Sequence, residues 1–135
     1  MSRENVEIVQ RVLDGFSRSD RASVEPLVHP DVEWRTVLGP LLGVESVSGR
    51  EAVLRLGFEE IPDVVEDYRV EVEELIDLGK ARVLVVARYR SRAKKSGIEI
   101  DERIASVHRL RDGMIVSVRD YPSRQEALDA AGLEE

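Results

Sequence analysis

Two side chains in this sequence combine acid–base chemistry with a position in an apolar segment. Asp120 ends the apolar run that follows Asp112-Gly113, and His108 lies within the apolar run before that turn. A carboxylate at the end of such a strand either contacts solvent or lines a pocket. In a pocket it could accept a proton from a bound molecule and return it, which is general acid–base catalysis.

Other kinds of chemistry find little support in the composition. The 135-residue sequence has no Cys, which excludes thiol nucleophiles, thiolate metal sites and disulfides. Its two histidines are far apart and no carboxylate spacing repeats, so we predict no metal site and no cofactor. A net charge of -7 repels phosphate backbones, which argues against nucleic acid as a partner. The N-terminus is charged and no apolar run approaches membrane-spanning length, so we expect no membrane association and a cytoplasmic location.

The hydrophobic pattern predicts helices first and strands later. Apolar residues at helical spacing follow Ser2, a short second helix ends near Pro30, and Ser48-x-x-Glu51 is a capping box for a third helix that Pro62 ends. Residues 39–49 are expected to form a loop. Alternating or continuously apolar runs predict strands within the ranges 32–37, 68–73, 82–92 and 98–110, and a last strand after the Asp112-Gly113 hairpin turn.

A final capping box, Ser123-x-x-Glu126, predicts a short C-terminal helix. Helices segregated from an antiparallel sheet define an α+β fold, and we find no repeat or linker that would divide residues 1–135 into more than one domain. The residues expected to be largely buried are Phe16, Leu27, Val53, Val70, Val85 and Val118.

Several ordered motifs give the chain a family resemblance. They are Asn5-Val6-x-x-Val9 with Phe16 and Asp20, His29-Pro30-Asp31-Val32-Glu33-Trp34, Gly49-Arg50-Glu51-Ala52-Val53, Leu110-Arg111-Asp112-Gly113 and Arg119-Asp120-Tyr121. In this order the sequence resembles SnoaL-like proteins of the nuclear transport factor 2-like superfamily along essentially its whole length. The resemblance implies a cone-shaped fold with three N-terminal helices packed on a curved antiparallel sheet, a short C-terminal helix, and a homodimer formed through the outer sheet face.

The resemblance also implies which side chains face the cavity. It turns the strand faces that bear Trp34, Arg88, His108 and Asp120 inward, and strand alternation adds Thr36, Ser106 and Val118 to the ligand-binding candidates. Asp120 and Arg88 are expected in direct or water-bridged reach of each other. The implied catalytic candidates are Asp120 as acid/base, Arg88 as its orienting partner and His108 as a polar neighbour.

Three activities of the superfamily fit the sequence unequally. The positions of the ketosteroid isomerase base and donors fall on Thr36, Ser106 and Val12, which cannot supply that chemistry. An epoxide hydrolase arrangement keeps Arg88 and Asp120 but has Arg90 where a carboxylate is needed. A cyclase of the SnoaL type requires only an inward aspartate in an apolar pocket, and is the enzymatic hypothesis least contradicted.

Non-catalytic interpretations stay open beside these. Arg88 and Asp120 could form a structural ion pair, Trp34 could belong to the core, and His108 could be a hydrogen-bonded residue at the pocket edge. We therefore expect a pocket protein for a small hydrophobic ligand or substrate, possessing cyclase, isomerase or hydrolase activity if it is an enzyme. The alternatives are a binding protein without catalysis and a dimeric scaffold whose cavity is filled by side chains.

Overall fold

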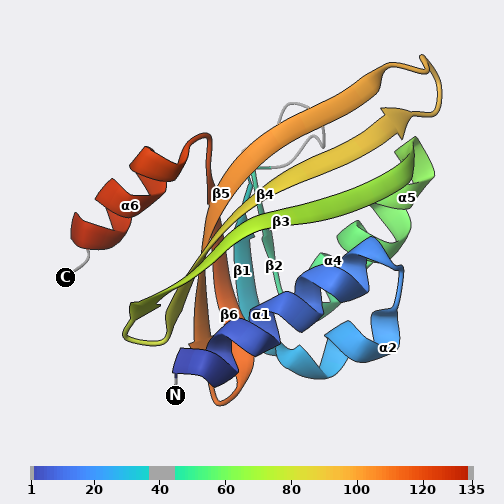
Figure 1. Cartoon of the computed structure of the whole chain (residues 1–135). Helices are drawn as coiled ribbons and strands as arrows, with labels where there is room; N and C mark the ends of the chain where they lie inside the picture. Colours follow the sequence, from blue (N-terminus) through green and yellow to red (C-terminus); the bar gives the residue numbers. More distant parts are fainter. Residues whose placement is uncertain (1, 37–44, 134–135) are drawn as a thin grey trace.

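The computed structural model describes residues 2–36 and 45–133. The N-terminal part of the chain forms most of a layer of helices (Figure 1). Apolar residues on one face of the first helix pack against the sheet, which explains its amphipathic sequence. The helical segments are α1 (Ser2–Ser17), α2 (Arg21–Val24), a 3₁₀ turn (Glu25–Leu27), α4 (Arg50–Arg55), a π turn named η2 (Leu56–Glu60), α5 (Ile61–Val64) and α6 (Arg124–Leu133).

A curved six-stranded sheet forms the other layer (Figure 1). The strands are β1 (Val28–Arg35), β2 (Ser46–Ser48), β3 (Val65–Gly79), β4 (Arg82–Ala93), β5 (Glu99–Arg111) and β6 (Met114–Tyr121). Their order across the sheet is β2-β1-β6-β5-β4-β3, and neighbours are antiparallel except β1 and β6, which are parallel. Since the long strands β3, β4 and β5 arch over α1 and α4, the two layers enclose a cone. The predicted α+β cone is confirmed.

The main hydrophobic core lies between these two layers. Val53 and Val85 are fully buried, as predicted, and Phe16, Leu27, Val70 and Val118 are half-buried and pack against the core. The buried members of the core are Val9, Val12, Leu13, Val24, Val28, Val32, Val53, Leu54, Val83, Val85, Ala87, Leu110 and Ile115.

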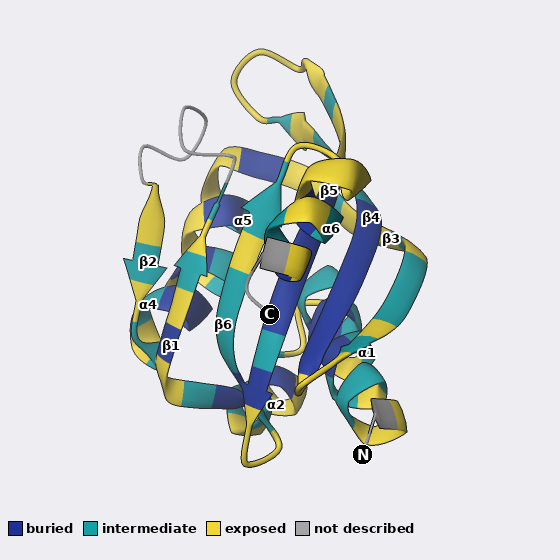
Figure 2. Ribbon diagram, turned by 90° about the vertical axis from the view of Figure 1, so that its left-hand side faces the viewer, coloured by how far each residue is buried: buried dark blue, intermediate teal, exposed yellow. Residues whose placement is uncertain are grey.

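A second, smaller core lies on the outer face of the sheet, beneath α6 (Figure 2). Its buried members are Leu84, Val86, Ala105, Val107 and Ala127. Arg82, which is only 3% exposed, links this helix to the sheet. Its Nη1 donates to the carbonyl of Ala131 in α6 at 2.8 Å, and its Nε and Nη2 donate to the carbonyls of Gly79 and Leu78 at the end of β3. The C-terminal helix therefore covers the face opposite to that of the other helices.

The sequence predicted one hairpin turn and one helix N-cap correctly, and it predicted another N-cap wrongly. Asp112 and Gly113 both have positive φ, 54° and 76°, as the predicted hairpin turn requires. Ser123 Oγ accepts from the backbone N–H of Glu126, as the C-terminal capping box predicted. By contrast, α4 is capped by Gly49 rather than by Ser48, because the chain turns there with a φ of 93°.

Three further element boundaries differ from the predictions. Pro62 lies in the first turn of α5, where its missing N–H costs nothing, so the helical segment continues to Val64. Strand β1 begins at Val28 and passes through Pro30, where its pairing with β6 is interrupted. The predicted loop 39–49 contains strand β2 at its end, and its residues 39–44 lie outside the described residues.

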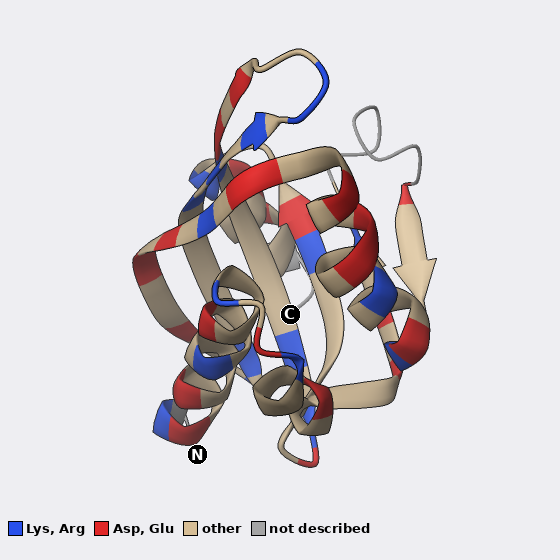
Figure 3. Ribbon diagram, turned by 90° about the vertical axis from the view of Figure 1, so that its right-hand side faces the viewer, with Lys and Arg blue, Asp and Glu red and all other residues tan. Residues whose placement is uncertain are grey.

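Charged residues cover the surface on both sides. The helical side carries acidic and basic residues close together (Figure 3), and Arg21 on α2 pairs with Glu25, Glu51 and Glu59. None of the helices described is long and apolar enough to cross a membrane.

Candidate functional site

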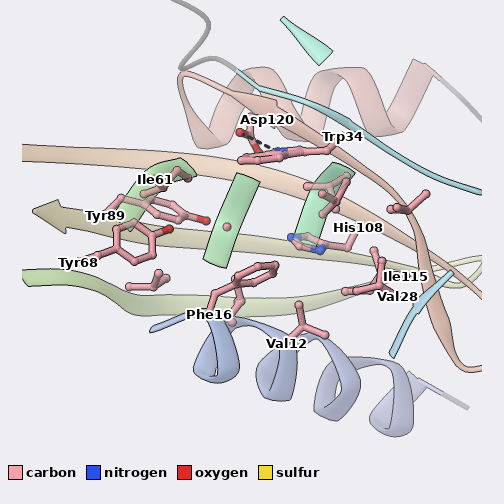
Figure 4. Close-up of a pocket in the computed structure, with 16 residues that line it drawn as sticks. Val12, Phe16, Val28, Trp34, Ile61, Tyr68, Tyr89, His108, Ile115 and Asp120 are labelled. Carbon is pink, nitrogen blue, oxygen red and sulfur yellow. Dashed lines mark hydrogen bonds between the residues drawn. The ribbon is translucent and has the colours of Figure 1, made fainter. Parts of the chain in front are cut away.

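The cone encloses a cavity of about 80 Å³ between α1, the α4–α5 segment and the sheet (Figure 4). One water molecule needs roughly 10–15 Å³ of such space, so the cavity has room for a small organic molecule. Most of the wall is apolar, formed by Val12, Leu13, Phe16, Val28, Val32, Val53, Gly57, Ile61, Val70, Ile115 and Val118. The side chains that bring polar atoms are Trp34, Tyr68, Tyr89, His108 and Asp120. None of the described lining residues is Lys or Arg.

Phe16 reaches the cavity because a glycine lies beside its ring. A Cβ built on Gly57 would lie 2.2 Å from Phe16 Cε1, so a side chain at this position would collide with the ring. The Phe16 ring also stacks on Phe58, with centroids 4.8 Å apart. The contact between α1 and the π turn thus shapes one wall of the cavity (Figure 4).

Asp120 is held by two side chains on neighbouring strands. Trp34 Nε1 on β1 donates to Asp120 Oδ2 at 3.2 Å, and Ser106 Oγ on β5 donates to Asp120 Oδ1 at 2.8 Å. Ser106 and Asp120 are directly opposite in the β5–β6 ladder, which explains their contact. These hydrogen bonds orient the carboxylate at the cavity wall, where the family resemblance had placed it.

Two tyrosines that the sequence analysis did not select also face the cavity. The hydroxyl groups of Tyr68 on β3 and Tyr89 on β4 point towards its centre (Figure 4). Burial raises the pKa of both phenols, and the nearby Asp120 carboxylate raises it further. A side-chain hydrogen bond with Ser106 lowers the pKa of Tyr89 in part. Both phenols are therefore protonated at neutral pH. The Tyr68 hydroxyl can donate a hydrogen bond to a ligand, whereas the Tyr89 hydroxyl bonds Ser106, whose own proton goes to Asp120.

His108 is the most isolated polar group of the cavity wall. Its side chain projects from β5 into the cavity, it is 4% exposed, and neither Nδ1 nor Nε2 has a hydrogen-bond partner among the described residues. Burial lowers the pKa of His108 to about 4, because the imidazolium form would lose its hydration. At neutral pH the ring is uncharged and offers one donor and one acceptor.

The prediction that Arg88 lies in the cavity with Asp120 is wrong. Arg88 is on the outer face of the sheet, where its Nη2 donates to Asp101 Oδ2 at 2.6 Å and its Nε to Oδ1 at 3.2 Å. The inward face of β4 is the one that carries Val85, Ala87 and Tyr89. The alternation along β4 was read correctly, but the resemblance turned the wrong face inward. The signal that could have identified Tyr89 was the charge of Arg88, Arg90 and Arg92, which share the opposite face of β4.

The other predicted ligand-binding residues have different positions. Trp34 and Val118 line the cavity, whereas Ser106 lies behind Asp120 as its hydrogen-bond donor. Thr36 is not a lining residue, because β1 ends at Arg35 and the alternation that places Val32 and Trp34 at the wall does not extend beyond the strand. Whether any of these residues contacts a ligand stays a prediction.

An irregularity in β6 explains one residue that simple alternation misses. The pairing of β5 with β6 shifts between Arg109 and Leu110, so Ile115 rather than Val116 joins Val118 and Asp120 at the cavity wall. In the described part of the chain, no group of three or more His, Asp and Glu side chains could hold a metal ion.

Solved structures resemble this fold along nearly its whole length. A nuclear transport factor 2-like protein of unknown function from Burkholderia pseudomallei is 23% identical, with 93% of this chain and 95% of that chain covered and a TM-score of 0.74. A hypothetical protein with a ketosteroid isomerase-like fold from Catenulispora acidiphila, in complex with trimethylamine, is 20% identical over 93% and 92% of the two chains, with a TM-score of 0.73. TerC, co-crystallised with polyporic acid, is 21% identical over 96% and 98%, with a TM-score of 0.74.

The fold is thus nuclear transport factor 2-like, a class in which a curved sheet and helices enclose a cone. The family model of the SnoaL-like domain matches residues 9–118, and the chain belongs to the SnoaL-like domain family. Among curated proteins, none matches the chain.

Proposed function

We propose that this protein binds a small, largely apolar molecule in the cone, and that Asp120 exchanges a proton with that molecule. The observation that carries the proposal is a single oriented carboxylate in the wall of an otherwise mainly apolar cavity. A carboxylate in such surroundings can act as general base and then as general acid. Cyclisation and isomerisation need no more than this, and hydrolysis also needs a water molecule that the carboxylate activates.

The remaining polar groups have a supporting role in this proposal. The Asp120 carboxylate removes a proton from a carbon next to a ligand carbonyl, and negative charge develops on the carbonyl oxygen. The protonated hydroxyl of Tyr68 and the uncharged His108 ring are hydrogen-bond donors that stabilise such an oxygen. In an isomerisation, the proton then returns from Asp120 to a different carbon of the ligand. In a ring closure, the carbanion attacks a second carbonyl carbon of the same ligand, the carbonyl bond opens to an alkoxide, and the proton returns from Asp120 to that alkoxide.

The solved structures support the coarser part of the proposal. One of them holds trimethylamine and another was co-crystallised with polyporic acid, so proteins of this fold bind small organic molecules of different chemistry. At about 20% identity they support the cone as a binding site and leave the reaction open.

The test starts from protein purified without added ligand, whose bound small molecules are released and identified by mass spectrometry. The identified compound, or a close analogue, is then incubated with the wild type and with Asp120→Asn. We expect Asp120→Asn to abolish turnover and to leave ligand binding and the melting temperature nearly unchanged. Asp31→Asn, which changes an exposed carboxylate on β1, is the matched control and should retain activity.

A binding protein without catalysis is the second candidate. It is supported by the two donors that hold Asp120, since such a network also serves to fix the packing of β1, β5 and β6. In that case Asp120→Asn would chiefly lower the stability of the fold, by about 1.5–3 kcal/mol for each hydrogen bond to the charged carboxylate that is lost. No compound bound by the wild type would then be converted.

Assembly and location are also proposals. We propose a homodimer through the outer sheet face, near a surface hollow of about 210 Å³ over β1, β5 and β6 that Arg35, Arg109, Arg119 and Tyr121 help to line. The cytoplasm is the proposed location.

A further inference from the structure

A second chamber adjoins the cavity on the side of α5. It has a volume of about 50 Å³ and shares five lining residues with the first cavity: Trp34, Ile61, Tyr68, Tyr89 and Asp120. We call the first cavity the inner chamber and the second the outer chamber. Because the same side chains face both chambers, the partition between them consists of side chains and is not a layer of backbone.

The outer chamber lies at the end of the cone that α5 and the adjoining ends of β3, β4 and β5 form. Its other lining residues are Val64 and Val65 at the end of α5 and the start of β3, and Ser91, Ile100, Glu102 and Ile104 on β4 and β5. Val64 is 51% exposed, so the rim of this chamber presents apolar surface to solvent. Exposed apolar surface at the mouth of a cavity favours the entry of an apolar molecule.

The two chambers differ in what they offer to a ligand. The inner chamber ends in His108, whose buried ring nitrogens have no partner among the described residues and which is uncharged at neutral pH. A buried polar group without a partner is costly, and a hydroxyl or carbonyl group at this position would satisfy it. The outer chamber is lined chiefly by hydrocarbon, with two polar side chains, Ser91 and Glu102, in addition to the shared partition.

We propose that the ligand is an uncharged, elongated molecule that spans both chambers, with a hydroxyl or carbonyl head group at His108 and a hydrocarbon tail in the outer chamber. This inference rests on the proposed function, in that it assigns a ligand class to the same cone. Tyr68 and Tyr89 surround the middle of the ligand, and Asp120 faces the bond that lies between head and tail. Ile100 and Val64 then determine how long a tail is accepted.

Spacing along the sheet supports this arrangement. Ser106 is opposite Asp120 in the ladder, and His108 lies two residues further along the same face of β5. Diagonal neighbours of this kind are about 7–8 Å apart. A head group bound to His108 therefore places Asp120 several atoms further along the ligand, at the partition and not at the end of the inner chamber.

The experiment uses 4-alkylphenols of increasing chain length, from phenol to 4-hexylphenol, as probes, and isothermal titration calorimetry as the measurement. Each buried methylene strengthens binding roughly fourfold, so we expect affinity to rise with chain length well beyond 4-ethylphenol. Ile100→Trp fills the outer chamber and should remove most of this gain for 4-hexylphenol while phenol binds as in the wild type. Val64→Trp, from the opposite wall, gives a second test if Ile100→Trp does not fold.

Ile98→Trp is the matched control, because Ile98 is on the same hairpin, is 65% exposed and does not line the outer chamber. It should leave the series unchanged. Affinity that stops rising at short chains in the wild type, or a loss in Ile100→Trp that is equal for phenol and 4-hexylphenol, would overturn the outer-chamber assignment.

The head-group assignment is tested with 4-alkylphenols against alkylbenzenes of equal length. The wild type should prefer the phenols, and His108→Leu should lose that preference. A preference that persists in His108→Leu and disappears in Asp120→Asn would overturn the assignment of the head group to His108. The outcomes are separate from those of the proposed function, since Asp120→Asn should keep the chain-length trend whether or not it abolishes turnover.

Discussion

At the scale of single residues, His108 is the side chain whose burial has the clearest energetic consequence. Its pKa is about 4 in the folded protein, against 6.5 for an ordinary histidine. The unfolded chain therefore takes up a proton near pH 6.5, while the folded chain resists protonation until about pH 4. Folding stability must fall as the pH drops through this window.

We predict that His108 lowers the free energy of unfolding by about 3 kcal/mol between pH 7 and pH 4. Urea unfolding of the wild type and of His108→Leu across this range measures the effect, and the variant should show a pH dependence weaker by that amount. His29→Gln removes the other histidine and is the control, expected to behave as the wild type. Equal pH dependence in the wild type and in His108→Leu would contradict the burial of this ring.

Trp34 supports a second residue-scale prediction. Trp34→Phe keeps an aromatic ring in place and removes the N–H that bonds Asp120 Oδ2. We expect a loss of about 1–3 kcal/mol of stability, because a half-buried carboxylate then lacks one donor. A double-mutant cycle with Asp120→Leu checks the cause. If Trp34→Phe costs the same in the Asp120→Leu background, the loss comes from the ring and not from the hydrogen bond.

The candidate site could be predicted from sequence only in part. Asp120, His108, Trp34 and Val118 were identified because alternation along one strand decides which residues share a face. Alternation does not say which of the two faces points inward, and for β4 this choice was made wrongly, so Arg88 replaced Tyr89. Tyr68 was not predicted as a cavity residue, because a single aromatic residue in an alternating strand is as consistent with a core as with a ligand site.

At the scale of elements, turns were predictable where a particular residue type is required. The Asp112-Gly113 turn was found because few other residues accept positive φ. The β3–β4 turn places Lys80 and Ala81 at φ values of 56° and 58°, although neither residue type favours a positive φ. Strand β2 was missed because its three residues are too few to show alternation.

Two glycines provide a matched prediction for these elements. Gly113 has a φ of 76° in the β5–β6 turn, whereas Gly132 lies in α6, and a Cβ at either position would meet nothing within 4 Å. Gly113→Ala should cost about 1–2 kcal/mol, because the left-handed conformation is unfavourable for alanine. Gly132→Ala should raise stability by up to about 1 kcal/mol, because alanine is the better helix former. Thermal unfolding of both variants measures this, and equal effects would contradict the assigned turn.

At the scale of the whole molecule, the outer sheet face is the surface on which we propose that two copies of the chain meet. Much of it carries ion pairs between strands, such as Arg103 with Glu73 and Arg88 with Asp101. If the proposed dimer forms there, Arg119→Glu should weaken it, because Arg119 lines the hollow over β1, β5 and β6. Sedimentation equilibrium at micromolar concentration should show a dimer for the wild type and more monomer for the variant. A monomeric wild type would contradict the proposal.

The C-terminal helix has a consequence for how the protein folds. All six strands precede α6 in the chain, so the strands can pair before the helix that covers Leu84, Val86, Ala105 and Val107 docks on the sheet. Until Arg82 bonds the carbonyl of Ala131, these apolar side chains are open to other unfolded chains. The interval between strand pairing and the docking of α6 is therefore when this protein is most prone to aggregate.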